Sequence, residues 1–535
     1  DAKALYIGGN MFDSTGTVFL GTNGYVVNKA SLLGGGPIVV TAFPGLTPSA
    51  SLDGPSSPRG VDNFDPASNE GYFIGNSNVF LGSLVARRIS DPGGLPTISP
   101  NLFITVNATD TPTPVAHLGN TGGNNGRLDA IDDRLFAAHI RNGRLWTAHD
   151  IGVLPTGVAG GTSGAGGTKR DAVRWYELSG VRSTDNGGVP VVVESGTIFD
   201  TSATVTTARQ FWMPTVMVSG QGHAAIGFST AGTPFRADAA TAGRLSDDPL
   251  SVTGNVAIYT SSATAYNPAG NPGGSGGRRW GDYSFTSLDP LDDMTMWTIQ
   301  EFCNATNSYG IRAVKLLAPP PAAPISAPGV PTGLASMAVV LTGLSTSGSG
   351  FYDPGPDLPA PALPFHHLSV SVTNTGVTGN APSVNSAHFI DPTHLQLDLN
   401  TTAADPNLPG EKYSVTVTNP DGQSVNGSMV LEVAAASTAV GANANAFRLE
   451  SVIPNPTTGA TRIAFSVAFQ TAVRLSIVDI QGREIALLAD GVLPAGRHEI
   501  EWNGRRGASR APAGIYFVRY LAGGRQQIRR LAMMH

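Results

Sequence analysis

Short apolar runs, bounded by glycine, asparagine and aspartate, recur through residues 1–316. The two clearest runs, 135–140 and 145–150, flank Asn142-Gly143, a dipeptide that is the strongest local signal for a β-hairpin. No run of comparable length repeats with the period of a helix, so we expect strands and tight turns. This spacing predicts a barrel, a large sandwich or a propeller, and the length suits six or seven propeller blades of about 45 residues.

The turn also predicts the register of this hairpin. With Asn142-Gly143 at the turn, His139 is expected opposite Trp146, and His149 opposite Phe136. The two histidines would then point to opposite faces and lie roughly 10 Å apart along the ladder, so they could not share a metal ion. Aromatic packing across the strands is their predicted role.

A proline-rich segment, 317–331, separates this region from a second β-rich one and is predicted to be a semi-rigid linker. In residues 332–433, apolar and polar residues alternate, as at Tyr413, Val415 and Val417, which gives one buried face. About 100 residues of this kind predict an immunoglobulin-like (Ig-like) sandwich.

A second linker of low complexity is predicted at 434–446, and residues 447–535 again contain alternating runs, such as 461–467, 473–480 and 514–521. They predict a smaller sandwich. The expected fold class is therefore all-β: an N-terminal β-propeller over 1–316, followed by two Ig-like β-sandwich domains.

The composition predicts an unusual surface, and the distribution of charge predicts separate modules. The chain has 66 glycines and 39 prolines in 535 residues, and only 13% of its residues are charged, which is typical of loop-dense proteins with uncharged surfaces. The net charge of −6 is too small to indicate a nucleic-acid partner. Residues 447–535 nevertheless carry a net +6 and the preceding 446 residues a net −12, as expected of distinct modules.

Two further counts exclude whole classes of site. The single cysteine, Cys303, excludes a disulfide framework and any metal site built from several cysteines. The sequence has no apolar run of 18 or more residues, so we expect no transmembrane helix.

The C-terminal segment has four motifs in an order and at a spacing that identify a resemblance. They are IPNPTTGATRIAFSV, VRLSIVDIQGREIALL, LPAGRHEIEWNG and APAGIYFVRYLAGGRQQIRRLAM. Together they cover nearly all of 447–535, and they resemble the secretion-sorting domain of the type IX pathway of Bacteroidetes-like bacteria. The resemblance implies recognition by the type IX secretion machinery, export across the outer membrane, and a location outside the cell or on its surface.

Five residues carry the local chemistry of this segment. Asn455, Pro456 and Gly482 stand where the strands must turn, and Gly514 and Tyr516 stand at the start of the expected last strand.

The middle segment resembles an IPT/TIG-type Ig domain, through GLSTSGSGFYDPG, FIDPTHLQLDLN and YSVTVTNPDGQS. That resemblance implies a module that spaces or displays others. Residues 1–316 are similar to uncharacterised propeller-like regions of large secreted bacterial proteins. The motifs are VDNFDPASNEGYFIG, DDRLFAAHIRNGRLWTAHD, RWYEL and RRWGDYSFTSLDPLDDMTMWTIQEF. The similarity implies no catalytic residues.

One segment concentrates groups that suit a binding surface. Arg279, Trp280, Asp282 and Tyr283 combine a planar cation, aromatic rings and a carboxylate, which suit a sugar or a peptide. A structural role is the alternative, with Trp280 in a core and Asp282 at a turn.

Calcium is the one cofactor for which the sequence offers candidate sites, at two acidic turns. The first contains Asp129, Asp132 and Asp133, and the second contains Asp289, Asp292 and Asp293. Calcium prefers several hard oxygen ligands, but aspartates also stabilise turns by hydrogen bonding to nearby backbone amides. Neither turn matches the twelve-residue calcium loop.

The sequence offers no credible catalytic constellation, and the leading hypothesis is therefore a non-enzymatic exported protein. Adhesion or assembly would occur through the propeller, which would bind an unidentified glycan or protein. A secreted hydrolase of glycans or peptides is one alternative, with carboxylates of raised pKa at the propeller mouth. A self-associating subunit of an extracellular filament or surface layer is the other.

Overall fold

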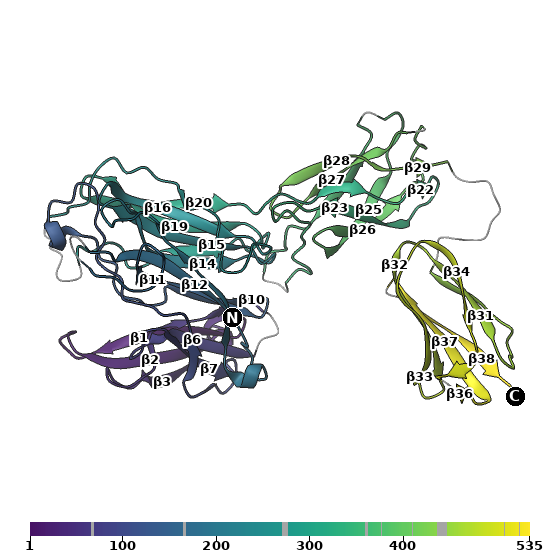
Figure 1. Cartoon of the computed structure of the whole chain (residues 1–535), viewed down its shortest axis with the longest axis horizontal. Helices are drawn as coiled ribbons and strands as arrows, with labels where there is room; N and C mark the ends of the chain where they lie inside the picture. The colour runs from purple at the N-terminus through teal and green to yellow at the C-terminus, as the bar shows by residue number, and fades with distance from the viewer. Residues whose placement is uncertain are drawn as a thin grey trace. The chain divides into compact units, whose positions relative to one another are not determined.

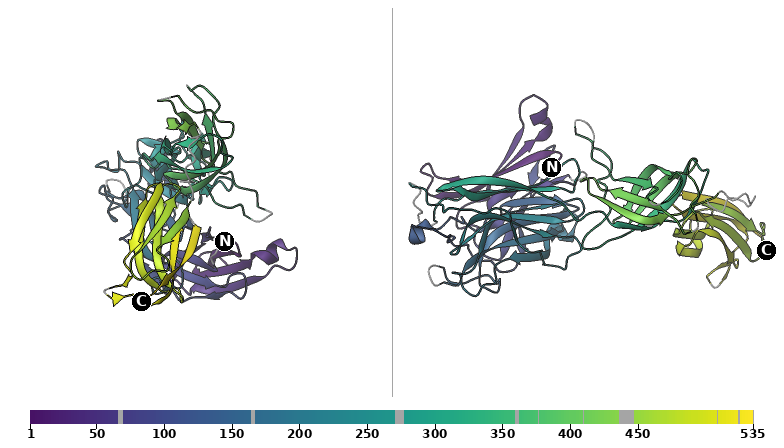
Figure 2. Two further views of the ribbon diagram at one scale, coloured as in Figure 1. Left: turned by 90° about the vertical axis from the view of Figure 1, so that its right-hand side faces the viewer. Right: turned by 90° about the horizontal axis from the view of Figure 1, so that it is seen from above.

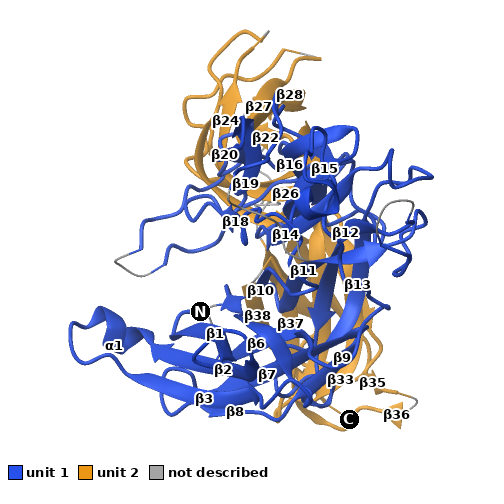
Figure 3. Ribbon diagram, turned by 90° about the vertical axis from the view of Figure 1, so that its left-hand side faces the viewer, with its two compact units in different colours: residues 1–321, 345–368, 419–423 blue, residues 322–344, 369–418, 424–535 orange. Residues whose placement is uncertain are grey.

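The computed structural model shows a chain that is nearly all β, with 52% of residues in strands and 2% in helices, which confirms the predicted class. The structure describes residues 1–65, 69–163, 167–269, 277–358, 362–375, 377–408, 410–435, 447–507, 509–523 and 525–534. They form two compact units (Figures 1 and 3). Unit 1 comprises 1–321, 345–368 and 419–423, and unit 2 comprises 322–344, 369–418 and 424–535.

Among its described residues, unit 1 contains five sheets that follow one another along the chain. The first sheet comprises β1 (Ala4–Phe12), β2 (Phe19–Asn28) and β3 (Val40–Thr47), with the short helix α1 (Lys29–Leu33) before β3. The second comprises β4 (Pro55–Gly60), β6 (Glu70–Ser77), β7 (Ser83–Ser90), β8 (Thr97–Ile98) and β9 (Leu102–Thr105).

The third sheet comprises β10 (Ala137–Arg141), β11 (Arg144–Val153), β12 (Arg170–Ser179) and β13 (Val191–Ile198), and β5 (Asp62–Asn63) joins it beside β10. The fourth comprises β14 (Gln210–Val218), β15 (Ala224–Gly232), β16 (Phe235–Arg244) and β17 (Ala257–Ile258). The fifth comprises β18 (Phe285–Leu288), β19 (Met296–Ala305) and β20 (Ser308–Leu316). Two 3-10 turns are η1 (Gly123–Gly126) and η2 (Asn186–Gly188).

Five sheets are fewer than the six or seven blades expected from length alone. The expectation assumed about 45 residues per blade, but connections consume much of this chain. The connection over 106–136, for example, runs through η1 and lies outside the five sheets.

Consecutive sheets of unit 1 pack face to face (Figure 3). Each interface has its own buried apolar cluster, represented by Val26 with Phe73, Ile74 with Ile140, Trp175 with Phe228, and Met217 with Met296. Every residue of β14 and β15 is buried, which explains why their sequences read as continuous apolar runs instead of alternating ones.

The first and fifth sheets each turn one apolar face outward. Ile7 on β1 and Phe285 on β18 are both 53% exposed, and Trp297 and Ile311 are exposed on β19 and β20. Figure 2 shows the first hairpin, in purple, projecting from the sheets drawn in teal. Among the described residues, no further sheet covers these faces, whereas the inner sheets cover one another.

The β10–β11 hairpin has the predicted register. His139 pairs with Trp146 across the ladder, and the turn residues Asn142 and Gly143 both have positive φ, at 52° and 70°. Positive φ at both positions is what a two-residue turn of this type requires. The prediction from the Asn-Gly dipeptide is therefore confirmed.

Unit 2 begins with strands inside the segment predicted to be a linker. β21 (Ala323–Ser326) pairs with β23 (Met337–Leu344), and β22 (Val330–Pro331) pairs with β29 (Val433–Ala434). The linker prediction was therefore wrong for these residues. Prolines are accepted there because β21 is an edge strand, and proline is tolerated at edges although it lacks an amide donor.

The rest of the middle segment forms two antiparallel sheets. One has the order β21-β23-β26-β25, with β26 (His394–Asn400) and β25 (Ser383–Asp391), and the other is β24 (Ser369–Thr373), β27 (Tyr413–Thr418) and β28 (Ser424–Leu431). Tyr413, Val415 and Val417 are fully buried, so the predicted alternation on β27 is confirmed. Residues 436–446 of the second predicted linker lie outside the described residues.

The C-terminal segment has two principal sheets and a shared core. One comprises β30 (Arg448–Ile453), β31 (Thr461–Val467) and β34 (Gly496–Trp502). The other has the order β33 (Glu484–Leu493), β32 (Thr471–Asp479), β37 (Gly514–Ala522) and β38 (Arg525–Met533), and a short ribbon joins β35 (Arg505–Arg506) to β36 (Ser509–Arg510). Phe465, Trp502 and Tyr520 lie in its core.

Candidate functional site

The first strands of all five sheets line one cleft of about 320 Å³, which we call the axial cleft. Its wall includes Tyr6 of β1, Arg59 of β4, His139 of β10, Met217 of β14 and Phe285 of β18. Each sheet therefore contributes its first strand to a common centre. The lining mixes aromatic rings, an aliphatic thioether and polar groups, as in many ligand sites.

His139 is a buried, uncharged member of this wall. Its Nε2 accepts a hydrogen bond from the amide of Val218 at 3.2 Å, and its ring contacts Phe64 edge to face. Burial, and then the charge of Arg141, lower the pKa of His139 to about 3. The ring is therefore neutral at physiological pH.

Tyr283 stands beside the cleft between two arginines, and we call these three residues the tyrosine clamp. The guanidinium of Arg59 lies over the ring, 4.5 Å from its centre, and Arg134 Nη1 donates to the Tyr283 hydroxyl at 3.1 Å. Burial alone would raise the pKa of Tyr283, but Arg59 and then Arg134 lower it below its ordinary value. The ring remains 48% exposed and also contacts Phe136 of the cleft wall.

The other predicted ligand residues divide into exposed and buried ones. Arg279 forms ion pairs with Asp129 at 3.3 Å and with Asp282 at 2.5 Å. Trp280 is only 1% exposed, and its Nε1 donates to Ser229 Oγ at 3.1 Å, so it belongs to the core. Trp280 therefore has the core position that was the structural alternative to a role in ligand binding.

The first acidic turn brings its side chains to different partners. Asp129 Oδ1 accepts from the amide of Ile131 at 2.8 Å, and Asp132 binds Arg134 through both carboxylate oxygens, at 2.6 and 2.7 Å. Asp133 is buried, and its Oδ1 accepts from Asn76 at 3.1 Å. Burial, and then the charge of Asp132, raise the pKa of Asp133 to about 6.

The second acidic turn is likewise occupied by donors of the protein. Asp289 Oδ1 accepts from the amide of Leu291, and Asp292 Oδ1 accepts from the amides of Met294 and Thr295. Asp293 pairs with Arg141. In the described ranges, no group of three or more histidine, cysteine, aspartate or glutamate side chains is arranged to hold a metal ion.

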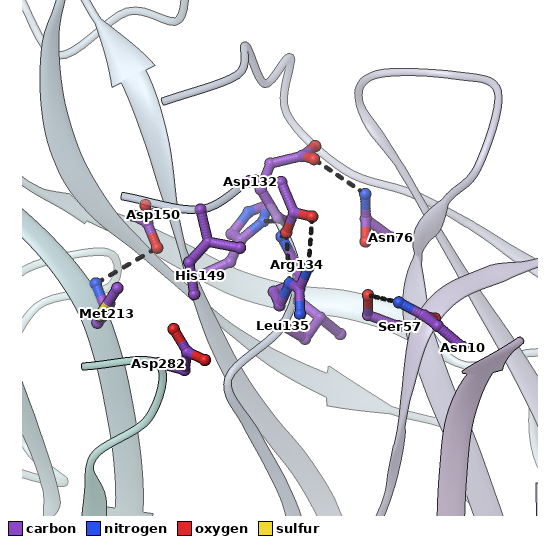
Figure 4. Close-up of polar contacts among 12 residues, drawn as sticks. Asn10, Ser57, Asn76, Asp132, Arg134, Leu135, His149, Asp150, Met213 and Asp282 are labelled. Carbon is purple, nitrogen blue, oxygen red and sulfur yellow. Dashed lines mark hydrogen bonds and ion pairs between the residues drawn. The ribbon is translucent and has the colours of Figure 1, made fainter. Parts of the chain in front are cut away.

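Sequence reasoning missed the polar contacts of His149 and Asp150, which lie near Arg134 of the tyrosine clamp (Figure 4). His149 is buried, with Nδ1 bonded to the Asp133 carbonyl at 2.7 Å and Nε2 to the Tyr176 hydroxyl at 3.1 Å. Asp150 is fully buried, and its Oδ1 accepts from the amide of Met213 at 3.4 Å. His149 and Asp150 are consecutive on β11, but their partners Asp133, Tyr176 and Met213 come from other segments, so no local pattern predicts these contacts.

Two strand irregularities lie near these groups (Figure 4). Ser57 and Met213 have left-handed backbone conformations, with φ of 43° and 53°. Each lies where the register of its strand shifts, in β4 and in β14. Bulges of this kind redirect side chains and recur near functional sites.

The predicted sorting-domain residues lie in turns and strand ends. Asn455 donates to the carbonyl of Arg530 at 2.7 Å and accepts from the amide of Ala532 at 2.9 Å. Pro456 follows it directly, and Gly482 has a φ of 78° in the turn after β32.

The remaining two motif residues belong to β37. Gly514 begins that strand, and Tyr516 is buried with its hydroxyl bonded to the carbonyl of Pro512 at 2.8 Å. β37 was expected to be the last strand, but β38 follows it along its whole length.

Comparison with protein families decides the nature of this segment. Residues 451–534 match the family model of the secretion system C-terminal sorting domain. These residues are a type IX sorting domain. The chain is therefore exported, to the extracellular space or the cell surface of a Bacteroidetes-type bacterium, and its sorting domain is a substrate of the type IX secretion machinery. No helix of the described ranges is long and apolar enough to span a membrane.

The comparisons leave the remainder of the chain without a family. A search of curated proteins found no match. Among solved structures, similar chains include the GBS pullulanase SAP in complex with maltotetraose, at 10% identity, and pullulanase type I from Bacillus subtilis str. 168 complexed with maltose, at 11%. The matches cover 39% and 42% of this chain, and 27% of each pullulanase.

Titin-A168169 is similar at 15% identity, over 39% of this chain and 95% of that one. The TM-scores of the three matches are 0.15, 0.15 and 0.14. Similarity at this level supports no argument about function.

Proposed function

We propose that the chain is an exported surface protein whose unit 1 binds an extracellular ligand without catalysing a reaction. The sorting domain delivers it outside the cell, and unit 1 supplies adhesion or assembly. The observation that carries the proposal is the tyrosine clamp, a half-exposed ring held between Arg59 and Arg134 beside the axial cleft. A fixed, partly exposed aromatic ring with adjacent arginines is typical of the residues that dominate binding to glycans or proteins.

The arrangement of unit 1 supports a propeller as its framework. Five sheets follow in chain order, and the first strand of each lines the axial cleft. In this proposal the sheets are blades, and the cleft is their common axis. The 332–433 segment serves as an Ig-like spacer of the IPT/TIG type, because its two antiparallel sheets have the strand number of such sandwiches.

A binding assay on the full-length protein tests this function. Beads coated with the purified chain are incubated with surface glycans and surface proteins of the producing bacterium and its neighbours, and retained molecules are measured. The Tyr283→Ala variant is expected to lose most retention, whereas Tyr309→Ala, which removes another exposed tyrosine of unit 1, retains it. Equal retention by both variants contradicts the proposed site.

A secreted hydrolase is the second candidate, and the raised pKa of Asp133 favours it. A carboxyl group with a pKa of about 6 suits a general acid, and Asp132 is adjacent to it. Turnover of polysaccharides or peptides by the wild-type chain, lost in Asp133→Asn, would replace the binding function with this one.

Self-association into a filament or layer is the third candidate. Exposed apolar residues of the first and fifth sheets outside the axial cleft, such as Leu20 and Ile311, favour it. Sedimentation of the full chain as a monomer at all accessible concentrations would exclude it.

A further inference from the structure

A second pocket of unit 1, of about 250 Å³, lies where the turn of the β10–β11 hairpin meets the end of β16. Trp146, Glu177 and Glu194 line it and form a row across three strands. Trp146 pairs directly with Glu177, and Glu177 pairs directly with Glu194. Directly paired residues on neighbouring strands share a face, so the three side chains point toward the same space.

Glu194 forms the fixed end of the row. Its Oε1 accepts from Arg244 Nη2 at 2.6 Å, and its Oε2 accepts from the amide of Ser251 at 2.7 Å. Both side chains of the ion pair are buried. With both oxygens engaged, Glu194 is a rigid part of the wall.

Glu177 is the accessible carboxyl of the pocket. Arg144 Nε lies 3.4 Å from its Oε1, at the exposed rim. Burial, and then the hydrogen bond and charge of Glu194, raise the pKa of Glu177 to about 7. Near neutral pH the group is therefore present both as a donor and as an acceptor of hydrogen bonds.

A buried donor in the wall has no partner. Arg244 lines the pocket, and only 5% of its surface is exposed. Its Nε makes no hydrogen bond to any described residue. Because this atom has almost no exposed surface, Arg244 contributes to the pocket as a fixed part of its wall and not as a free donor to a ligand.

Two of the three arginines of the pocket are balanced by carboxylates inside the protein. Arg244 is paired with Glu194 and Arg141 with Asp293, whereas Arg144 lies beside Glu177, which is only partly ionised near neutral pH. A charged ligand would have to compete with these pairs, whereas hydroxyl groups can accept from arginine and donate to glutamate at once. Trp146 borders the pocket but is only 6% exposed, because its ring is stacked on Trp175.

We propose that this pocket binds one neutral, hydroxyl-rich sugar residue, as a site separate from the tyrosine clamp. The volume suits a single sugar ring, and the mixed donors and acceptors of the wall match its hydroxyl groups. The inference does not depend on the ligand of the axial cleft, which lies among other residues.

Saturation-transfer NMR on the full chain tests this site with glucose, galactose, mannose and N-acetylglucosamine, and with the charged sugars glucuronic acid and glucosamine. At least one neutral sugar is expected to bind. Glu177→Ala and the rim variant Arg144→Ala should each weaken that binding about tenfold or more, since each removes hydrogen bonds to charged groups. Thermal unfolding of both variants shows whether they remain folded.

The control variant is Tyr309→Ala, which removes an exposed tyrosine of unit 1 outside both proposed sites and should keep sugar binding. Failure of every neutral sugar to bind, binding of the charged sugars alone, or loss only in the clamp variant Tyr283→Ala would overturn the site. Unchanged affinity in both pocket variants would also overturn it. If sugar binding follows the expected pattern while bead retention is absent, the proposed function fails and this site stands.

Discussion

Asp150 on β11 and Asp171 on β12 lie diagonally on neighbouring strands, both fully buried, and each keeps its Oδ2 without a hydrogen-bond partner in the described ranges. Their other oxygens accept from the amides of Met213 and Thr113. Burial raises the pKa of both carboxyls well above the ordinary value, and Asp171 raises that of Asp150 further. This pair makes the stability of unit 1 depend on pH.

The Asp150→Asn variant should therefore be more stable than wild type at pH 7. Below about pH 4 both folded and unfolded chains hold the proton, so Asp150 contributes no pH dependence. As pH rises above that value, the unfolded chain ionises while the folded chain retains the proton, and stability falls until the raised pKa is passed. Urea unfolding at pH 4 and pH 7 measures the effect.

The exposed Asp91→Asn is the matched control and should keep the wild-type difference in stability between pH 4 and pH 7. A variant Asp150→Asn that is less stable than wild type at pH 7 but equal to it at pH 4 would contradict the assignment.

The hairpin turn is the second test. Gly143 has a φ of 70°, a conformation that costs other residues about 1 kcal/mol or more, so Gly143→Ala should lower the free energy of unfolding by that amount. Gly9→Ala is the control, because Gly9 lies in β1 with ordinary φ and open space around its Cα. Comparable destabilisation by both variants, measured by thermal unfolding, would argue against the turn geometry.

The third test concerns a buried ion pair in unit 1. Arg141 and Tyr352 both bond to Asp293, at 2.5 Å for the tyrosine hydroxyl. Removing Arg141 leaves a largely buried carboxylate without its cation, so Arg141→Met should cost about 3 kcal/mol or more.

The double variant Arg141→Met with Asp293→Asn should be less destabilised than the sum of the single changes. A double-mutant cycle by chemical denaturation measures this coupling. Additivity of the two changes would mean that the pair contributes no mutual stabilisation.

The fourth test concerns the sorting domain. Asn455→Ala removes two hydrogen bonds to the backbone of β38, so it should destabilise this domain by about 1–2 kcal/mol. Hydrogen exchange of residues 525–533 should accelerate, while Gln481→Ala, a change on an exposed turn, leaves it unaltered. Exchange that is slow in both variants would show that Asn455 does not hold the last strand.

Local patterns predicted much of this structure. Asn142-Gly143 predicted a turn and, through it, the pairing of His139 with Trp146, because a two-residue turn leaves only one register. Alternation predicted the buried face at Tyr413, Val415 and Val417. These predictions succeeded because they depend on residues that are neighbours in the chain or directly across one ladder.

The groups of the two proposed binding sites were predicted only in part. Tyr283 was identified as a ligand residue, but its arginine partners, Arg59 and Arg134, come from other segments and were not. The row of Trp146, Glu177 and Glu194 also went unpredicted, because it depends on the register of three strands. Carboxylates that looked alike in the sequence have different partners in the structure. Asp132 binds an arginine, whereas Asp292 accepts hydrogen bonds from backbone amides.

By itself, the sequence determined the all-β class, the β10–β11 hairpin and the type IX sorting domain at 451–534. Composition, the period of apolar residues and contiguous motifs are properties of residues that are close in the chain, so they can be predicted without the tertiary structure. Only the tertiary structure decided that the first strands of five sheets share a cleft. It also decided which side chains contact Tyr283 and which carboxyl groups are buried away from water. Burial and pairing across sheets join residues far apart in the chain, and these contacts determine both the charge states of the side chains and the surface that we propose for binding.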